Sequence, residues 1–466
     1  MTTGYAFKGG FPTPETIARA YDDLDMNRAV QAYRFFYPTV SGAAVVKGWR
    51  DAGLRPNRTF GVLETQPRHV SFTPHPDAPY AQILIDLGGG PIVVELPPGP
   101  LVVSAVDVNQ RWVADMGVPG PDEGKGGTHL FLPPGHRGEV PGGHHVWQAT
   151  TKTLIVGGRS LPAGGDVKAA LARIRTIKVY PLAPPPEWRE PEWLELTEKP
   201  EDTTPLQWET NLQFWEALHQ VIDTEPAVGQ YRAYYGELAA LGIAKGRPFA
   251  PDDRMKRILE AAAATGNAQL RVEAFACRRP DRIAWKDRRW EWAALRSENG
   301  DFDTPAHVDL EARDKWFYQA IGASPAMFRR SAGAGSLYWL ALRDATDTYL
   351  DGSKTYRLVL PQPVPAKLCW SVTVYDAETR SEIQTVQNRP ALRSLVEMKD
   401  RMGDAVAMYF GPFPPLALER DWVQTNLGKG WFAYLRLYGP VSTAFDGSWK
   451  PGDFEPYKET PPVSAA

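Results

Sequence analysis

The sequence predicts a mainly β protein in which a helical insert separates two jelly-roll-like antiparallel β-sandwich domains. The chain of 466 residues is longer than a single hydrophobic core normally serves, so two folding units are expected. In residues 60–182, short apolar runs are separated by Pro and Gly clusters about every ten residues, which is typical of a sandwich or barrel. Residues 336–466 show the same texture, and "KLCWSVTVYD" alternates with the period of a strand.

The chain is expected to open with a helical segment, residues 1–59. Pro14 and Glu15 suit the first turn of a helix. Ile17 and Leu24 belong to a run of apolar residues spaced at helical intervals. A helix or a pair of helices therefore precedes the first sandwich.

Between the two β regions, the composition predicts a linker followed by helices. Residues 183–205 are rich in Pro and Glu, as in an extended linker. Residues 206–335 contain strong helix formers, for example in "DDRMKRILEAAAATGNAQLRVEAFA", which begins with two aspartates. We expect this helical insert to brace the two sandwiches.

The two β regions repeat a few residues in the same order, which predicts an internal duplication of one sandwich topology. In each region an aspartate precedes a tyrosine, one strand ends in Leu-Pro, and the next strand ends in an aspartate followed four residues later by an arginine. Each region closes with an arginine, a proline and an aspartate. These residues are Asp77, Tyr80, Leu96, Pro97, Asp107, Arg111, Arg159, Pro162 and Asp166 in the first region, and Asp351, Tyr356, Leu360, Pro361, Asp376, Arg380, Arg436, Pro440 and Asp446 in the second.

The repeated D-x-x-x-R motif has two interpretations. Four residues that turn back at the end of a strand could bring the carboxylate and the guanidinium together as a bidentate pair that pins the loop. Alternatively, Asp107 or Asp376 is a general base beside a cleft.

One strand of the second region, "WFAYLRLYGP", places three aromatic residues and an arginine on one face. They are Phe432, Tyr434, Arg436 and Tyr438. Such a face is either the edge of a core with an arginine that reaches toward solvent, or the floor of a ligand cleft.

Histidines are concentrated in the first region, where they raise the question of a metal site. His75, His129 and one of His144 and His145 could converge on an ion, because neighbouring residues of an extended chain point to opposite faces. Their spacing matches no known metal signature. We therefore expect polar loop histidines, no metal and no other cofactor.

Several function classes are not supported. A formal net charge of −3 without long basic runs argues against nucleic acid as a partner. Two distant cysteines, Cys277 and Cys369, suit a reducing compartment. The N-terminus lacks the pattern of a secretory signal, and no uninterrupted apolar run reaches roughly 18 residues, so a soluble cytoplasmic protein without a membrane partner is expected. The nucleophile motif G-x-S-x-G and the glycine-rich nucleotide motifs are missing.

The sequence resembles bacterial proteins that pair two domains of unknown function, DUF1254 at the N-terminal side and DUF1214 at the C-terminal side. The first likeness runs through "AVQAYRFFYP", "PHPDAPY", "PIVVELP", "VDVNQRW" and "LIVGGRSLPAGGDV". The second runs through "YLDGSKTYRLVLP", "CWSVTVYDAETRSEIQT", "DWVQTNLGKGWFAYLRLYGP" and "WKPGDFE". The resemblance implies two jelly-roll-like sandwiches, the second similar in fold to glycan-amidase sandwiches, but it implies no reaction.

This chain departs from the family pattern at two places. Family members tend to read N-P-D-T-x-Y where this chain has "HPDAPY", which keeps Pro76, Asp77 and Tyr80 but has His75 in place of the asparagine and Ala78 in place of the threonine. They also tend to have an asparagine before a tryptophan where this chain has Asp421. Chemistry that depends on the amide or the hydroxyl is therefore not carried over.

The first functional hypothesis is a hydrolase-like enzyme that acts on a small organic or glycan-like substrate in a cleft formed by the two sandwiches. An aspartate would activate water, and an arginine or a tyrosine would stabilise the oxyanion. The polar candidates are His75, Asp77, Tyr80, Arg111, Asp376, Arg380 and Asp421, and the substrate-binding candidates are Trp112, Trp370, Trp422, Arg436 and Tyr438.

The second hypothesis is a protein that binds a carbohydrate or a small aromatic molecule without turning it over. Jelly rolls often serve as binding modules, and the tryptophan and tyrosine rings would form the binding platform. Both hypotheses take a small molecule as the partner, and homo-oligomerisation is left open.

Overall fold

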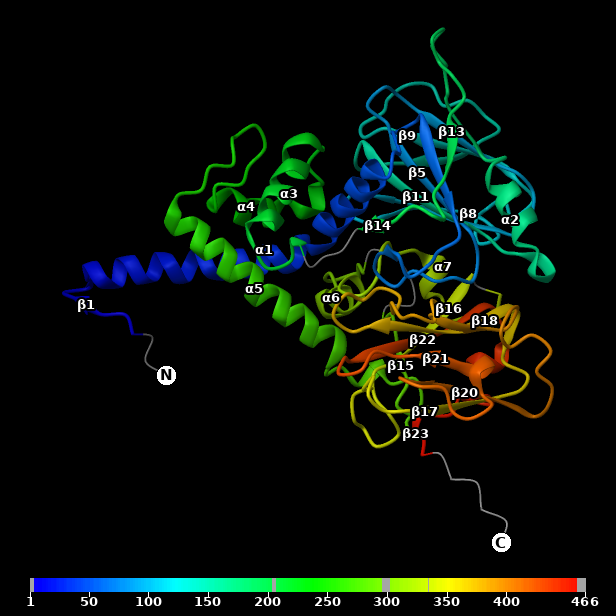
Figure 1. Cartoon of the computed structure of the whole chain (residues 1–466). Helices are drawn as coiled ribbons and strands as arrows, with labels where there is room; N and C mark the ends of the chain where they lie inside the picture. The colour runs from blue at the N-terminus through cyan, green and yellow to red at the C-terminus, as the bar shows by residue number, and fades with distance from the viewer. Residues whose placement is uncertain (1–3, 203–206, 296–301, 334, 459–466) are drawn as a thin grey trace.

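Two β-sandwiches lie one above the other, with most of the helices beside them (Figure 1). The computed structural model describes residues 4–202, 207–295, 302–333 and 335–458. The chain is thus a mainly β protein with a helical insert, as the sequence predicts. The jelly-roll connection of the strands stays a prediction.

The first sandwich packs a six-stranded sheet against a four-stranded sheet. The first sheet has the order β13 (Glu192–Glu195), β3 (Thr59–Leu63), β5 (Tyr80–Asp86), β11 (Thr153–Ser160), β7 (Leu101–Asp107) and β8 (Trp112–Gly117). The second has the order β10 (His145–Gln148), β9 (Gly127–Leu132), β6 (Ile92–Leu96) and β12 (Lys178–Pro181). Alternate residues such as Ile83, Val103 and Val156 point into the core between the sheets. The helix α2 (Val167–Ile174) follows β11.

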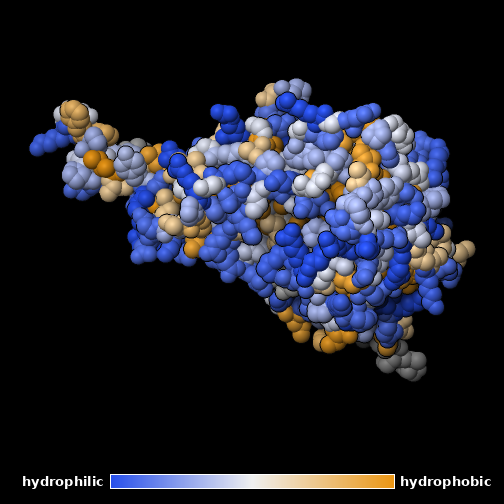
Figure 2. Space-filling model, turned by 90° about the horizontal axis from the view of Figure 1, so that it is seen from above, coloured by the Kyte–Doolittle hydropathy of each residue, from blue (hydrophilic) through white to orange (hydrophobic). Residues whose placement is uncertain are grey.

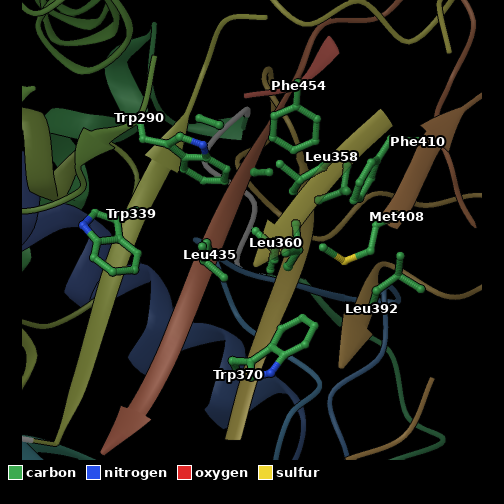
Figure 3. Close-up of a cluster of buried hydrophobic side chains, with 14 of the residues drawn as sticks. Trp290, Trp339, Leu358, Leu360, Trp370, Leu392, Met408, Phe410, Leu435 and Phe454 are labelled. Atoms are coloured by element: carbon green, nitrogen blue, oxygen red, sulfur yellow. The ribbon is translucent and has the colours of Figure 1, made fainter. Parts of the chain in front are cut away.

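The second sandwich packs a five-stranded sheet against a four-stranded sheet. The first has the order β15 (Glu291–Trp292), β16 (Ser336–Ala341), β22 (Trp431–Pro440), β18 (Ala366–Asp376) and β19 (Ala391–Arg393). The second has the order β21 (Trp422–Gln424), β20 (Ala405–Gly411), β17 (Tyr356–Pro361) and β23 (Glu455–Pro456). Figure 3 shows Trp339, Leu360, Met408 and Leu435 in the core between these sheets.

The strand orders confirm the predicted duplication. The run β3-β5-β11-β7-β8 of the first sandwich corresponds in order to β15-β16-β22-β18-β19 of the second, and β10-β9-β6-β12 corresponds to β21-β20-β17-β23. The directions agree as well, since β9 and β10 are parallel and so are β20 and β21. Asp107 ends β7 and Asp376 ends β18, so the aspartates of the two D-x-x-x-R motifs are equivalent.

One part of the predicted repeat is wrong. Asp77 and Tyr80 precede or begin β5, whereas Asp351 and Tyr356 precede or begin β17. The counterpart of β17 is β6, not β5. The resemblance between these two aspartate and tyrosine pairs is therefore not part of the duplication.

The N-terminal helix and most helices of the insert form one helical unit, whereas the last short helix packs against β16. The helices are α1 (Pro14–Asp51), α3 (Leu212–Thr224), α4 (Arg232–Ala240), α5 (Asp253–Phe275), α6 (Leu310–Phe317) and α7 (Pro325–Phe328). Thr13 caps α1 and Asp252 caps α5 by accepting backbone N–H groups. The two long helices approach closely because Gly266 leaves room for the ring of Tyr33. Among the described residues, no helix is both long and apolar enough to cross a membrane.

The start of the chain projects from the body of the protein. A short hairpin of β1 (Phe7–Lys8) and β2 (Phe11–Pro12) precedes α1, and the space-filling view shows it at the end of a projecting arm (Figure 2). Phe7 and Phe11 are both exposed there.

The predicted linker, residues 183–205, contributes strands to the fold, so its interpretation as a simple linker is wrong. Its segment β13 runs parallel to β3 at the edge of the first sandwich, and the ring of Trp193 contacts Phe60 at 5.5 Å between centroids. The short strand β14 (Glu201–Asp202) pairs with β4 (His69–Val70). The aromatic and leucine side chains of "EWLE" explain why this stretch pairs despite the surrounding prolines. Residues 203–205 lie outside the described residues.

Arg380 ties the helical unit to the second sandwich. Its guanidinium is buried and pairs with Glu209, and it also donates to the hydroxyl of Tyr37 at 3.2 Å. The carbonyl of Tyr318 accepts a third hydrogen bond at 3.2 Å. Asp376 instead accepts the backbone N–H groups of its own turn, so the predicted bidentate pair within D-x-x-x-R is wrong.

The Arg380→Met variant is expected to lower the free energy of unfolding by roughly 3–5 kcal/mol, because it leaves the carboxylate of Glu209 buried without its cation. Denaturant titration measures this change. A second variant that combines Arg380→Met with Glu209→Gln should recover part of the loss.

Arg401→Met is the matched control, since Arg401 pairs with Asp421 near the surface. It should change the free energy of unfolding by less than about 1 kcal/mol. Equal effects of the two single variants would contradict the role assigned to Arg380.

Candidate functional site

A pocket of about 160 Å³ lies where the outer face of the six-stranded sheet meets the outer face of the five-stranded sheet. The inner faces of both sheets fill the sandwich cores, so the alternate side chains face one another across this pocket. Those that the site depends on are Tyr80, Gly157 and Arg159 from the first sandwich and Tyr338, Tyr434 and Arg436 from the second. The end of α1 and the residues around α6 close the remaining sides, through Trp49, Trp316 and Ile321.

The two sandwiches contribute equivalent tyrosine and arginine pairs to this pocket. Arg159 lies five residues after Leu154, which is paired with Asp107, and Arg436 lies five residues after Trp431, which is paired with Asp376. The two arginines therefore occupy equivalent positions of the repeat.

Each arginine also has a tyrosine opposite it on the neighbouring strand. Arg159 is paired with Tyr80, and its guanidinium carbon lies 5.0 Å from the centre of that ring. Arg436 is paired with Tyr338, at 5.4 Å from the ring centre. These distances suit cation–π contact. Each repeat thus contributes one arginine and tyrosine pair to the pocket.

Neither guanidinium has a carboxylate among the ion pairs of the described residues. Arg436 donates to the hydroxyl of Tyr375 at 2.5 Å and to the carbonyl of Thr73 at 2.9 Å, which are both neutral acceptors. Its Nε atom is buried and has no hydrogen-bond partner, and the same is true of the Nε atom of Arg159. Two cations therefore remain uncompensated by direct pairing at the pocket.

The loop "PHPDAPY" lies between the sandwiches and holds a closed hydrogen-bond network. The hydroxyl of Tyr438 lies 3.0 Å from Nε2 of His75 and donates to Oδ2 of Asp77 at 3.2 Å. The N–H of Asp77 donates to Nδ1 of His75 at 3.3 Å, and Ser371 donates to Oδ2 of Asp77 at 2.8 Å. With Nε2 of His75 as the protonated nitrogen, the donors and acceptors of this cycle match, whereas Oδ1 of Asp77 is buried without a hydrogen-bond partner.

Burial and contacts set the charges in this network. Burial lowers the pKa of His75 to about 3, so its ring is neutral. Burial works to raise the pKa of Asp77, but its contact with His75, the charge of Arg436 and the Ser371 hydroxyl outweigh burial and hold this pKa at about 2. Asp77 is thus a buried anion beside a neutral histidine.

The same loop separates the interdomain pocket from a second one of about 240 Å³. His75 and Tyr80 line the first pocket, whereas Asp77 lines the second together with Cys369 and Arg389. The carboxylate of Asp77 therefore lies in the wall of the interdomain pocket, on the side that faces the second pocket.

The structure brings together some of the residues predicted from sequence. His75, Tyr80 and Arg436 line the interdomain pocket, and Asp77 and Tyr438 join the network in its wall. The face of "WFAYLRLYGP" that carries Tyr434 and Arg436 thus borders a pocket, as one of its two interpretations holds.

The other polar candidates lie elsewhere. Arg111 is near the ring of Tyr231, and Arg380 belongs to the ion pair with Glu209. Asp376 accepts N–H groups of its own turn. Asp421 pairs with Arg401. The D-x-x-x-R motifs and Asp421 therefore do not contribute to this pocket.

The three predicted tryptophan platforms also lie away from the pocket. Trp112 is on the edge strand β8 and contacts Trp147, with 6.1 Å between ring centres. Trp370 points into the core of the second sandwich (Figure 3). Trp422 donates to the carbonyl of Gly411 at 2.9 Å. Each of these rings has a packing role.

The histidines do not converge. His129 and His145 are paired on neighbouring strands of the first sandwich, with 5.0 Å between their rings, and His129 contacts Asp122. His144 contacts the hydroxyl of Thr128, while His75 lies in the loop between the sandwiches. In the described part of the chain, no group of three or more suitable side chains could hold a metal ion.

Sequence reasoning missed several residues of the site. The sequence places Arg159 only in the repeated order of residues and Tyr434 on a strand face that could border a cleft, and it gives Tyr338 and Gly157 no role in a site. The signal that finds them is strand register, because each is defined by its partner in an equivalent strand. Glu382, which is buried near Asp77 and Arg436, was missed as well.

Each of the two sandwich regions matches a known family model. The fold and the pocket define a class of two-sandwich proteins with an interdomain cavity. The family model described as a protein of unknown function, DUF1254, matches residues 58–181, and that of DUF1214 matches residues 335–442. The chain therefore carries matches to both domain models in the order that the resemblance of its sequence predicts.

One solved structure shares the fold, and a second shows a lower similarity. The VPA0106 protein from Vibrio parahaemolyticus has a TM-score of 0.57 and 17% identity, over 93% of this chain and 100% of its own. An uncharacterised protein from Burkholderia cenocepacia has a TM-score of 0.41 and 10% identity, over 94% of this chain and 96% of its own. No curated protein gives a significant match.

Glu382 makes stability depend on pH. Burial raises its pKa to about 8; the charge of Arg436 opposes this shift and that of Asp77 adds to it. An unfolded glutamate releases its proton near its ordinary pKa of 4.5. Between these values the folded state binds more protons, so the free energy of unfolding should fall as the pH rises from about 4.5 to 8.

The Glu382→Gln variant should show a weaker decline over that range, because its neutral side chain has no proton to lose. Denaturant titration at several pH values measures the slope. Glu378→Gln is the control, since Glu378 is exposed in the same turn and its variant should keep the slope of the wild type. An unchanged slope in Glu382→Gln would contradict the assignment.

Proposed function

We propose that the protein binds a small organic molecule in the pocket between its two sandwiches. The observation that carries this proposal is the space above Gly157 in the middle of β11. A side-chain carbon added there would meet no atom within 4 Å. Glycine in the interior of a strand weakens the strand and often marks a place that a ligand approaches.

The equivalent position in the second sandwich carries a side chain that Gly157 lacks. Gly157 lies three residues after Leu154, and Tyr434 lies three residues after Trp431, so the two are equivalent. One repeat fills this position with an aromatic ring, whereas the other leaves it empty. The asymmetry keeps the pocket open on the side of the first sandwich.

The composition of the walls also suits a ligand site. Apolar side chains such as Val106, Ile155 and Trp316 surround a few convergent polar groups, which are mainly the two arginine and tyrosine pairs. This combination is typical of pockets for small molecules.

The Gly157→Leu variant tests the proposal, because the first side-chain carbon has room at this position and the leucine would extend into the pocket. Screening small organic molecules by thermal shift should find compounds that stabilise the wild type, and the variant should lose those shifts. Its own melting temperature should stay the same or rise, since a cavity has been filled with apolar atoms.

Gly158→Ala is the matched control on the opposite face of the same strand. Its new carbon would lie 3.2 Å from Ala81, inside the sandwich core. This variant should lose stability but keep the ligand-induced shifts. Full retention of those shifts by Gly157→Leu would contradict binding in this pocket.

The second candidate function is hydrolysis of a small molecule in the same pocket. It is favoured by His75, which lines the pocket, is neutral and stands beside the anionic Asp77. In this function His75 would orient the attacking water, and a guanidinium would stabilise the oxyanion. Asp77 would position His75 through their contact at 3.3 Å, because the pKa values of both groups lie far below neutral and make each a weak base.

In this candidate function, Asp77→Asn should lower kcat by roughly 10²-fold on the esters or amides that the wild type hydrolyses, the loss expected when a positioning group is removed. Steady-state kinetics with the ligands found in the thermal screen measure this. Full turnover by Asp77→Asn would remove Asp77 from the mechanism.

A further inference from the structure

The two arginines of the pocket are unusual because burial without an ionic partner is costly for a cation. Arg436 is 2% exposed. Arg159 is partly buried, has a buried Nε atom without a hydrogen-bond partner, and lines the pocket. A fold that needed only to pack these sheets would be more stable with apolar side chains at both positions. The presence of an equivalent arginine in each repeat is better explained by binding of a ligand.

The other ionisable groups around the pocket do not cancel both charges. His69 and His75 are neutral because burial lowers the pKa of each. Glu382, with its pKa raised to about 8 by burial, is mostly protonated at neutral pH. Asp77 is the remaining carboxylate that acts on Arg436.

Two further arginines near the loop are already compensated. Arg380 pairs with Glu209, and Arg393 pairs with Glu397 at 2.6 Å. The two pocket arginines and Asp77 therefore leave an excess of one positive charge beside the pocket.

We propose that the ligand is a small organic acid whose carboxylate is bound between Arg159 and Arg436, with its apolar or aromatic body against the hydrophobic wall. This inference rests on the proposed binding function. Guanidinium groups are the side chains best matched to a carboxylate, since their N–H groups form a planar fork. Both arginines line the pocket, so their guanidinium groups are the cationic donors nearest to such a ligand.

The rest of the pocket supports an apolar body of limited size. Val45, Trp49, Ile155 and Ile321 form a continuous hydrophobic wall from α1, β11 and the segment after α6. A cavity of about 160 Å³ is suited to a small acid rather than to an oligosaccharide or a nucleotide. The aromatic rings of Tyr80 and Tyr338 border the arginines and would flank the carboxylate end.

Calorimetric titration of the full chain with matched acids and amides tests the proposal. The probes are benzoate and phenylacetate, with benzamide and phenylacetamide as neutral counterparts of the same shape. The wild type should bind the acids at least about tenfold more tightly than the amides, as one charge-assisted contact implies. Gly157→Leu should bind neither class.

Arg159→Met is the decisive variant because the side chain of Arg159 stabilises no carboxylate of the described protein. It should lose roughly 10- to 100-fold in affinity for the acids and keep its affinity for the amides. The ligand-free variant should unfold at the same or a higher denaturant concentration than the wild type, since a buried cation has been removed. This second readout detects a variant that has simply failed to fold.

The outcomes separate the two proposals. Amides that bind as tightly as acids, or an Arg159→Met variant that keeps full affinity for the acids, would overturn the organic acid but leave the pocket as a binding site. Failure of all four probes to bind the wild type would overturn the organic acid. If the thermal-shift screen also finds no compound whose stabilising effect is lost in Gly157→Leu, the proposed binding function is contradicted as well.

Discussion

The structure depends on the contact between two equivalent sheets that turn their outer faces toward each other. Each sandwich has its own core, so the outer face of its larger sheet would otherwise be exposed to water. Helices α1 and α6 and the loop "PHPDAPY" cover the edges of this contact. Because equivalent strands supply both faces, the contact brings equivalent side chains together, and Arg159 and Arg436 border the same pocket for that reason.

The three prolines of the loop explain how its polar side chains stay in place. Pro74, Pro76 and Pro79 restrict the backbone before folding, so little further entropy is lost when His75 and Asp77 are ordered. The carbonyls of Pro74 and Pro76 accept from Tyr375 and Arg393 of the second sandwich. The loop belongs to the first repeat by sequence, but its hydrogen bonds are to the second repeat. It therefore forms a fixed wall between the two pockets.

Much of the fold could be predicted from the sequence because alternation and turn spacing report directly on strands. The repeated Leu-Pro and Asp residues even predicted the duplication. The site was harder to predict, because the alternation of residues separates the two faces of a strand but does not reveal which part of the protein each face packs against. Trp370 therefore looked like a binding platform although it faces a core, and Arg380 looked like the partner of Asp376 although Glu209, distant in sequence, is its partner.

The most direct test of the organic acid site is a crystal structure with 4-bromobenzoate, in which the anomalous signal of bromine fixes the orientation of the ligand. The account predicts a peak in the interdomain pocket near Ile155 and Trp316, with the carboxylate within hydrogen-bond distance of Arg159 and Arg436. A bromine directed at the arginines, or a ligand bound only outside this pocket, would contradict it.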